Sequence, residues 1–236
     1  MKLVSTFCLF LIFSFSVQAQ LSLKKLKNTV TGQSLSTEEI ASGLKEALIN
    51  GTSKGTDLVS KLDGYYKNPE IKIPFPQEVK NVESRLRQIG LGSEVDKFVE
   101  SLNRGAEDAA KEANPIFISA IKQMSIQDAY SILKGNNDAA TQYLNKTTSP
   151  LLKDKFLPVI KASLEKVNAT KYYSDLVTAY NKIPLIQKVN PELDQYATDR
   201  AIQGLFVMIA KEEKDIRENP LARTSDILKK VFNSSN

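Results

Sequence analysis

The sequence predicts an all-α protein: an irregular multi-helix bundle of about nine or ten helices, joined by short connections and interrupted by one proline-rich extended strap. Three observations lead to this prediction. Apolar residues recur every three or four positions along most of the chain, as on one face of a helix. Helix-capping residues and glycine or proline stops separate these runs. No stretch alternates apolar and polar residues for long enough to predict a paired strand.

The first predicted helix begins at Ser36, which can form a capping box with Glu39 because each side chain satisfies a free backbone N–H. Its apolar stripe consists of Ile40, Leu44, Leu48, Leu58, Val59 and Leu62. Gly43, Gly51 and Gly55 lie near this stripe, although each glycine weakens a helix by about 1 kcal/mol. We therefore expect another helix to approach closely there.

The strap is predicted over residues 68–76, because its three prolines forbid helix and hold the preceding residues extended. Ile71, Ile73 and Phe75 alternate with polar residues, so one side of the strap can lie along the helices. Glu70 and Lys72 then face water.

Capping and stop signals divide the middle of the chain into three helices. The first covers 79–89 and ends at Gly90 in a left-handed conformation, with Leu91 packing back. Ser93 caps the second, whose apolar stripe runs from Val95 to Ala113. Asn114 and Pro115 open the third, over 116–124.

The remaining helices follow the same logic. Ser125 with Asp128 caps a helix over 126–133, and Gly135 ends it. Asp138 caps a helix over 139–144, and Pro150 with Thr148 or Ser149 opens one over 151–167. Another helix covers 169–180, the strongest covers 192–217 and ends before Pro220, and Thr224 or Ser225 caps a last helix over 227–232. Residues 36–236 are thus expected to form a single all-helical domain.

The leading residues 1–19 have the pattern of a secretory signal peptide: Lys2, a short apolar run, and small residues before a cleavage site after Ala19. Residues 20–35 are rich in Lys, Ser, Thr, Asn and Gln and are expected to be a flexible tether. The apolar run is shorter than the roughly 20 residues of a membrane span, so we expect no transmembrane anchor after signal removal. Cys8 lies inside the run, so a lipoprotein is not expected; the mature chain should be periplasmic or secreted.

Composition excludes several function classes. The net charge of +5 comes from basic residues mixed with acidic ones, so no basic face is predicted and nucleic acid is not expected as a partner. The chain has no histidine, and its one cysteine leaves with the signal peptide, so Ser-His-Asp and Cys-His sites cannot form. Zinc and iron lose their usual nitrogen and sulfur ligands. We therefore assign no catalytic, cofactor or metal residue and expect no cofactor.

Several polar residues are unusually placed. Glu212 lies on the apolar stripe of the 192–217 helix, where a charge needs a partner, and Arg104 or Arg223 is the expected one. Glu213 and Arg217 are expected to form an ordinary surface pair. The candidate polar cluster consists of Asn103, Arg104, Glu107, Asp128, Asp138, Thr141, Tyr143, Glu212, Arg217 and Arg223. A structural network of caps and buried ion pairs is the favoured interpretation, ahead of a polar pocket for an anionic or sugar-like ligand.

An ordered series of motifs identifies a resemblance. The motifs are Lys72-Ile73-Pro74-Phe75-Pro76, Gly90-Leu91-Gly92, Ser101-Leu102-Asn103-Arg104, Pro115-Ile116-Phe117, Ala120-Ile121-Lys122-Gln123-Met124, Asp128-Ala129, Gly135, Asp138-Ala139-Ala140-Thr141-Gln142-Tyr143, Gly204-Leu205-Phe206, Ile209-Ala210-Lys211-Glu212-Glu213, Ile216-Arg217 and Ala222-Arg223-Thr224. Over about residues 36–232 the chain resembles a bacterial exported family catalogued as domain of unknown function 4197. Gly105 departs from the alanine expected of the family. The resemblance implies a helical domain in the bacterial envelope and supplies no activity.

The favoured function is therefore a non-catalytic binding or interaction module of the cell envelope, with an envelope protein or a small anionic ligand as partner. One alternative is a carboxylate-dependent hydrolase acting on envelope glycans or lipids, with Glu107 or Glu212 as the acid. The other is an oligomeric structural envelope protein, which would expose a large apolar patch.

Overall fold

The computed structural model describes residues 36–182, 184–185, 188–190, 192–219 and 229. Within these residues the chain forms eight α-helices, one 3-10 helix and no strand, which confirms the all-α prediction. The helices are α2 (Thr37–Val59), η1 (Gln77–Val79), α3 (Lys80–Gln88), α4 (Gly92–Ala110), α5 (Ala113–Gln123), α6 (Ile126–Lys134), α7 (Ala139–Glu165), α8 (Ala169–Tyr180) and α9 (Leu193–Glu218). The predicted signal peptide and tether, and the predicted 227–232 helix except for residue 229, lie outside the described residues.

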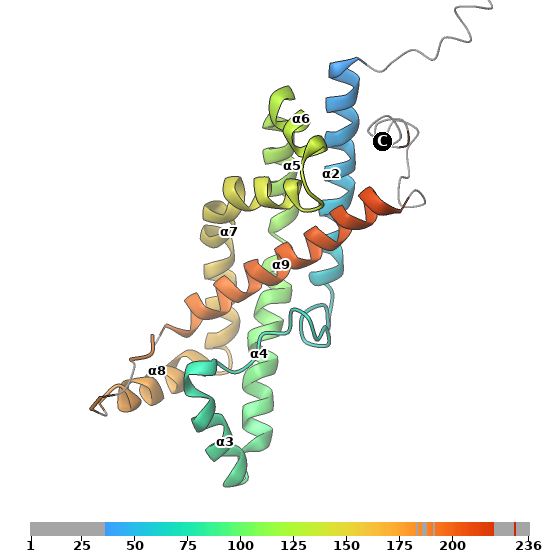
Figure 1. Cartoon of the computed structure of the whole chain (residues 1–236). Coiled ribbons are helices and arrows are strands. Elements are labelled where there is room, and N and C mark those ends of the chain that lie inside the picture. The colour runs from blue at the N-terminus through green and yellow to red at the C-terminus, as the bar shows by residue number, and fades with distance from the viewer. Residues whose placement is uncertain (1–35, 183, 186–187, 191, 220–228, 230–236) are drawn as a thin grey trace, which may run out of the picture. The chain divides into compact units, whose positions relative to one another are not determined.

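The core forms where α9 packs against α2, α4 and α7, and α4 packs along α7 (Figure 1). In Figure 1 the orange-red α9 runs obliquely across the other helices. The fully buried large side chains come from all of these elements: Leu44 in α2, Leu102 in α4, Leu144, Leu152, Phe156, Ile160 and Leu164 in α7, and Leu193 in α9. The core therefore does not depend on any single helix pair.

Two α2 glycines allow the close approach that the sequence predicted. A Cβ on Gly51 would lie 3.1 Å from Ile216 Cδ1, and a Cβ on Gly55 would lie 2.8 Å from Ile209 Cδ1. The buried face of α2 contains more small residues than the sequence predicted. Leu58 and Leu62, predicted to be buried, are 40% and 75% exposed, whereas Thr52 and Thr56 are buried. The helix turns its glycine and threonine face, rather than Leu58, toward α9, and Leu62 lies beyond the end of the helix.

Gly204 of α9 offers a direct test of this close packing. A Cβ there would lie 2.8 Å from Tyr65 Cε1 and 3.0 Å from Ile71 Cβ, and both side chains are buried. We expect Gly204→Ala to lower the free energy of unfolding by about 1–3 kcal/mol through overpacking. Gly105→Ala is the matched control, because its nearest contact, Ser163 Cβ at 3.4 Å, is an ordinary one.

The control should keep or raise stability by up to about 1 kcal/mol, because alanine favours helix more than glycine. Urea denaturation of both variants measures the two changes. If Gly204→Ala is as stable as Gly105→Ala, the contact between α9 and the segment around Tyr65 and Ile71 is not as close as described.

The predicted helix break at Pro150 is wrong. Residues 139–144 and 151–167 were expected to form two helices, but α7 is continuous and holds Pro150 and Pro158 inside it. Each proline removes one helical hydrogen bond, to the carbonyl four residues earlier. Both prolines and the residues four positions before them are exposed, so water can bind the freed carbonyls. Figure 1 shows α7 bending part-way along its length, which is the usual effect of an internal proline.

The segment over 68–76 has no regular secondary structure after a turn. The N–H groups of Ile71 and Lys72 both donate to Asn68 O, so the segment starts as a turn rather than extended chain. Ile71, Ile73 and Phe75 are buried, and Lys72 is exposed. The apolar alternation in the sequence therefore corresponds to the buried side of this segment.

Two predicted caps differ from the structure, and two stops agree with it. α4 begins at Gly92 with Leu91 at the N-cap position, so Ser93 is not the cap. α5 begins at Ala113, and Asn114 instead accepts a hydrogen bond from Ser53 Oγ at 2.9 Å, linking α5 to α2. Gly90 has the expected left-handed φ of 90°, and Gly135 follows the last residue of α6.

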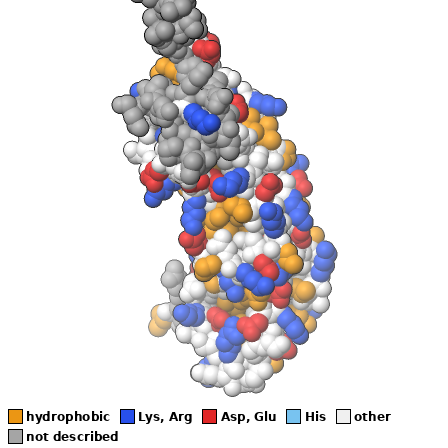
Figure 2. Space-filling view, turned by 90° about the vertical axis from the view of Figure 1, so that its right-hand side faces the viewer, with side chains coloured by type: hydrophobic (Ala, Val, Ile, Leu, Met, Phe, Trp, Pro, Cys, Tyr) orange, Lys and Arg blue, Asp and Glu red, His pale blue; other side chains and the backbone are white. Residues whose placement is uncertain are grey.

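The surface mixes charges of both signs. On the face shown in Figure 2, Lys and Arg side chains are interspersed with Asp and Glu, and hydrophobic side chains lie between them. None of the described helices has an apolar stretch long enough to cross a bilayer.

Candidate functional site

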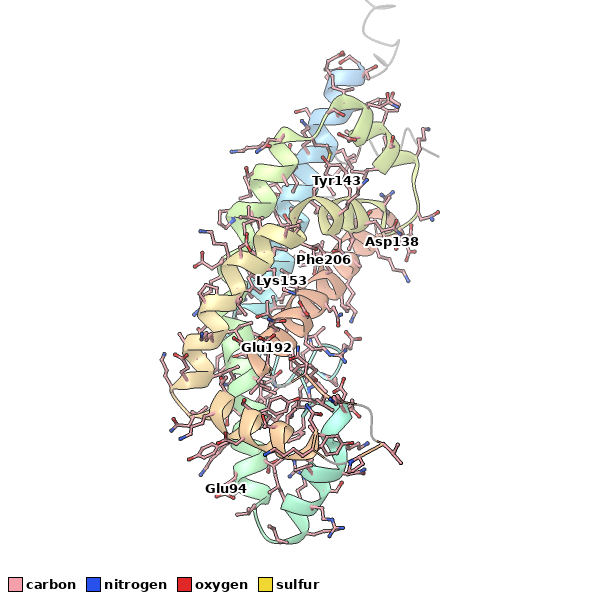
Figure 3. All side chains as sticks on the ribbon, turned by 90° about the vertical axis from the view of Figure 1, so that its left-hand side faces the viewer. Glu94, Asp138, Tyr143, Lys153, Glu192 and Phe206 are labelled. Carbon is pink, nitrogen blue, oxygen red and sulfur yellow. The ribbon has the colours of Figure 1, made fainter. Side chains whose placement is uncertain are left out.

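The structure separates the candidate polar residues into distinct groups instead of one cluster. Asn103, Arg104 and Glu107 lie on α4, Glu212 and Arg217 on α9, Thr141 and Tyr143 on α7, and Asp128 on α6. Figure 3 shows Asp138 and Tyr143 near the start of α7, well away from Glu94 at the first turn of α4. Arg223 lies outside the described residues. Each group therefore has to be considered by itself.

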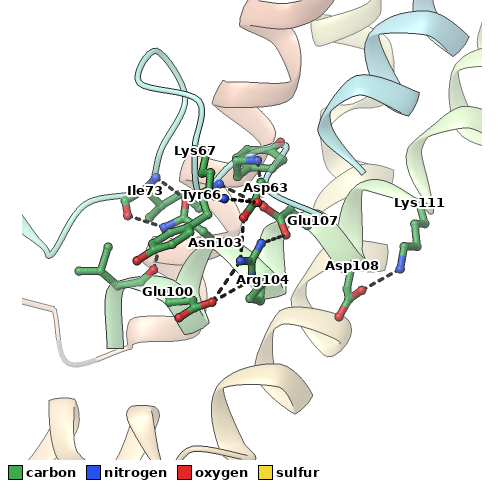
Figure 4. A network of polar contacts seen from close by, with 12 residues as sticks. Asp63, Tyr66, Lys67, Ile73, Glu100, Asn103, Arg104, Glu107, Asp108 and Lys111 are labelled. Carbon is green, nitrogen blue, oxygen red and sulfur yellow. Dashed lines mark hydrogen bonds and ion pairs between the residues drawn. The ribbon is translucent and has the colours of Figure 1, made fainter. Parts of the chain in front are cut away.

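The first group is the Arg104 network, which consists of Asp63, Glu100, Arg104 and Glu107 (Figure 4). Arg104 Nη1 donates to Glu107 Oε2 at 2.7 Å. Its Nη2 donates to Asp63 Oδ1 at 2.8 Å and to Glu100 Oε1 at 3.1 Å. Hydrogen bonds from Lys67, and then from Arg104, hold the pKa of Asp63 below its usual value. The guanidinium thus has three carboxylate partners within the protein.

Glu107 ties this network to the chain that follows α2. Its Oε1 accepts the backbone N–H groups of Tyr65 and Tyr66, each at 3.1 Å. Glu107 is 4% exposed, and Tyr65 is fully buried with its hydroxyl donating to Ala201 O. Burial of that phenol is the main cause that raises the pKa of Tyr65, and the nearby charge of Glu107 raises it further. Glu107 therefore acts as an anchor for a turn.

Asn103 does the same for the segment that follows. Its Nδ2 donates to Ile73 O and its Oδ1 accepts the Ile73 N–H, both at 2.8 Å. The side chain also donates to Val99 O at 2.7 Å and is completely buried. Since this amide pairs with both backbone groups of one residue, it fixes the register of the 68–76 segment on α4. Asn103 and Glu107 of α4 thus both bind backbone groups of the chain that follows α2.

The second group joins α9 to the start of α7. Glu213 accepts the N–H groups of Ala140 and Thr141 and the Thr141 hydroxyl, at 2.8–3.0 Å. Arg217 Nη2 donates to Glu213 Oε1 at 2.8 Å and to Ile132 O at 2.9 Å. The two side chains are only 5% and 10% exposed, so the predicted surface pair is in fact buried. It is buried because Glu213 caps α7 from a different helix.

This cap replaces the one predicted from Asp138. Asp138 occupies the N-cap position, but its side chain makes no cap bond and accepts from Gln142 Nε2 at 2.8 Å. Tyr143 lies half-buried one turn into α7, and burial, followed by the nearby charge of Asp128, raises the pKa of its phenol. Neither residue contacts the Arg104 network.

Glu212 has a partner other than the expected Arg104, and the other candidate, Arg223, lies outside the described residues. Its Oε2 lies 2.7 Å from Lys54 Nζ of α2, and the Lys54 side chain is 61% exposed. Arg104 is bound by other carboxylates, so that predicted pairing is wrong. Glu107 and Glu212 are both buried and bound to different partners, which is not the open pair of carboxyl groups that a hydrolase needs.

The predicted capping box at Ser125 and Asp128 is confirmed. Ser125 Oγ accepts the Asp128 N–H at 3.0 Å, and Asp128 Oδ2 accepts both the Ser125 N–H and the Ser125 hydroxyl. The hydroxyl, and then the backbone N–H, lower the pKa of Asp128. Because the folded pKa is depressed, the cap stabilises the protein above the usual aspartate pKa and loses that effect as pH falls through the lowered value.

We expect Ser125→Ala to raise the pKa of Asp128 toward its usual value, because it removes the hydroxyl hydrogen bond, which is the main cause of the lowered pKa. An NMR titration of the Asp128 carboxyl carbon in both proteins measures the shift. Ser119→Ala on α5, an exchange of the same residue type, should leave that pKa unchanged. If the Ser125 and Ser119 variants titrate alike, the hydroxyl is not the cause of the depressed pKa.

A pocket lies beside the Arg104 network, and the sequence did not single it out. It is lined by Phe75, Leu86 and Leu91, by Glu94, Val95, Lys97, Phe98, Glu100, Ser101 and Arg104 of α4, by Ser163, Lys166 and Val167 at the end of α7, and by Ala169, Tyr172, Tyr173 and Asp175 of α8. We call this the α4–α8 pocket. Its volume is about 1050 Å³, at the upper end of the roughly 300–1,000 Å³ of small-molecule sites. In Figure 3 α8 crosses in front of α4 at this place.

The wall of the α4–α8 pocket is mostly apolar and aromatic. The ring centroids of Phe75 and Phe98 are 5.0 Å apart, and those of Phe98 and Tyr173 are 6.3 Å apart. Burial is the main cause that raises the pKa of Tyr173 to about 12. Asn103 holds the neighbouring Ile73 on α4, so the polar residues that the sequence identified support one wall of an apolar site.

The sequence contained only weak signals for this pocket. Phe98 lies on the apolar stripe of α4, which predicts a buried side chain, but it is half-buried. Tyr172 and Tyr173 are adjacent in a short helix, where one points out and one points in, and such a pair is common on ordinary surface helices. Among the described residues, no group of three or more acidic, histidine or cysteine side chains could hold a metal ion.

Comparison with known proteins gives a family and no activity. The family model described as protein of unknown function (DUF4197) matches residues 34–233, which is most of the chain. No curated protein matches the chain. No solved structure matches it either.

Proposed function

Because the chain belongs to the DUF4197 family, whose function is unknown, we propose from the α4–α8 pocket that the protein is a non-catalytic binding module of the cell envelope, exported by its leading segment, that binds an apolar ligand. The observation that carries the proposal is a pocket of about 1050 Å³ lined by a mainly apolar wall. The secretory pattern of residues 1–19 supports the location.

Three features favour binding over a purely structural role for this cavity. The pocket is open to solvent at one side, so it is filled by water when no ligand is bound. Apolar walls gain little from water. Large apolar side chains also remain exposed at the edge of the α4–α8 pocket: Leu91 is 40%, Val167 52% and Tyr172 67% exposed. A ligand that covers them removes this area from water.

The polar groups beside the pocket support binding rather than turnover. Glu107 is buried, is paired with Arg104 and accepts two backbone N–H groups. Glu100 is bound to the same arginine. A general acid or base has to reach the bond that reacts, and both carboxylates are already used to hold the fold. The network is therefore suited to keeping the α4 wall rigid.

The proposal predicts saturable binding of an uncharged apolar dye, such as N-phenyl-1-naphthylamine, whose fluorescence rises in apolar surroundings. We expect Val167→Asp to weaken this binding about tenfold or more, because a carboxylate at the mouth has to be desolvated when the dye binds. The matched control is Val207→Asp on α9, where the valine is similarly exposed, at 43%, and does not line the pocket.

A fluorescence titration of both variants, with helicity checked by circular dichroism, makes the test. Equal dye affinity for the two aspartate variants would contradict the proposed site. Should Val167→Asp lose helicity, Tyr172→Ser replaces it, since Tyr172 is largely exposed and lines the same mouth.

A further inference from the structure

The charged residues of the α4–α8 pocket fall into two kinds. Glu100 and Arg104 form an ion pair at 3.1 Å and belong to the Arg104 network. The other four are Glu94 and Lys97 of α4, Lys166 after α7, and Asp175 of α8. These four side chains belong to exposed residues, and none of them forms an ion pair with another described residue. We call them the rim charges.

The signs of the rim charges limit the head group that a ligand can carry. Two are positive and two are negative, and they surround a pocket whose wall is apolar. A ligand head that covers them removes them from water, and a charge removed from water has to be paired or its desolvation is costly. An uncharged head would pair none of them. A purely anionic head could pair the lysines but would repel Glu94 and Asp175, and a cationic head would do the reverse.

The shape of the site limits the rest of the ligand. The aromatic rings of Phe75, Phe98 and Tyr173 follow one another along the wall, and a flexible alkyl chain can contact all three. Each methylene buried contributes about as much as any other, so affinity should grow with chain length.

Building on the proposed function, we infer that the ligand is a zwitterionic phospholipid-type amphiphile: its alkyl chain occupies the α4–α8 pocket, its phosphate lies at Lys97 and Lys166, and its ammonium lies at Glu94 and Asp175. In a zwitterionic head group of this kind both signs of the rim charges find a partner. The occupant is a single amphiphile, because the apolar groups line one pocket of about 1050 Å³.

The test compares four amphiphiles with the same dodecyl chain, each titrated below its critical micelle concentration by isothermal calorimetry. They are dodecylphosphocholine, dodecanoate, dodecyltrimethylammonium and dodecyl maltoside. We expect dodecylphosphocholine to bind at least about tenfold more tightly than each of the others. The double variant Lys97→Gln, Lys166→Gln should remove this preference and leave the affinity for the maltoside within about twofold.

The matched control is Lys80→Gln, Lys161→Gln, which removes two exposed lysines of the neighbouring helices that do not line the pocket. It should retain the preference for phosphocholine. Equal affinity for the four head groups, or tightest binding of dodecanoate or dodecyltrimethylammonium, would overturn the head-group assignment and leave the apolar pocket standing. If all four amphiphiles fail to bind while the apolar dye binds, the phospholipid is overturned and the pocket takes another class of ligand, such as an apolar peptide. Failure of both dye and amphiphiles would overturn the proposed function itself.

Discussion

Glu213→Ala is expected to lower the free energy of unfolding by about 3–5 kcal/mol, one of the two largest single effects we predict in this protein. The carboxylate is 6% exposed and serves two helices at once. Its loss takes the acceptor from the buried N–H groups of Ala140 and Thr141 and removes one carboxylate from the buried Arg217. A buried donor that loses its acceptor costs about 1–3 kcal/mol, and the loss of the ion pair adds to that cost.

Glu212→Ala is the control, since it removes the same side chain from the adjacent position. Its partner Lys54 is 61% exposed and can turn to water, so the loss should stay below about 1 kcal/mol. Urea denaturation midpoints of the two variants compare these losses of stability. Equal losses would show that Glu213 is not the carboxylate on which the junction of α7 and α9 depends. Glu213→Gln should fall between wild type and alanine, because it keeps an acceptor and loses the charge.

The second large effect is expected for Glu107→Ala, at about 2–4 kcal/mol. The two backbone N–H groups that Glu107 binds would lose their acceptor, and an unsatisfied buried polar group costs about 1–3 kcal/mol. Arg104 keeps Asp63 and Glu100 as partners, so the guanidinium stays paired in this variant.

Glu100→Ala is the matched control for this prediction, because it removes a carboxylate from the same arginine. The Glu100 side chain is 44% exposed, so its loss should cost under about 1 kcal/mol. Hydrogen exchange at Tyr65 and Tyr66 gives a second measurement: it should accelerate in Glu107→Ala and stay near wild type in Glu100→Ala. If the two variants match in both measurements, Glu107 does not anchor the turn.

Much of the fold could be predicted because local signals and tertiary packing agree. The all-α class follows from helical spacing, and the Ser125 cap and the Gly90 stop depend only on neighbouring residues. The close approach at Gly51 and Gly55 was also predictable, since a helix tolerates such glycines where another helix needs the space. The cap and the stop could be predicted because their causes lie within a few residues.

The errors arose where a distant residue replaces a local one. Asp138 has the sequence of an N-cap, but Glu213, more than seventy residues away, binds the free N–H groups of α7 instead. Pro150 has the sequence of a helix start, but its helix continues because the freed carbonyl can reach water. Leu58 and Leu62 looked like core because they are apolar, yet α9 packs on the smaller residues of α2.

The candidate site shows the same division. The polar residues of α4 were recognised because charges and amides on an apolar stripe are unusual. Their partners Asp63 and Ile73 were not, because pairing across helices has no signature in the spacing of residues. The α4–α8 pocket was missed altogether, since an empty space between helices consists of ordinary residues such as Phe98 and Tyr173.

We expect an apolar chain to occupy the α4–α8 pocket. A crystal structure of the protein with dodecylphosphocholine would show the position of this chain. We predict continuous density for the alkyl chain along Phe75, Phe98 and Tyr173, with the phosphate near Lys97 and Lys166. Chain density that ends outside these rings, or a pocket closed by its own side chains while the ligand lies elsewhere, would contradict it.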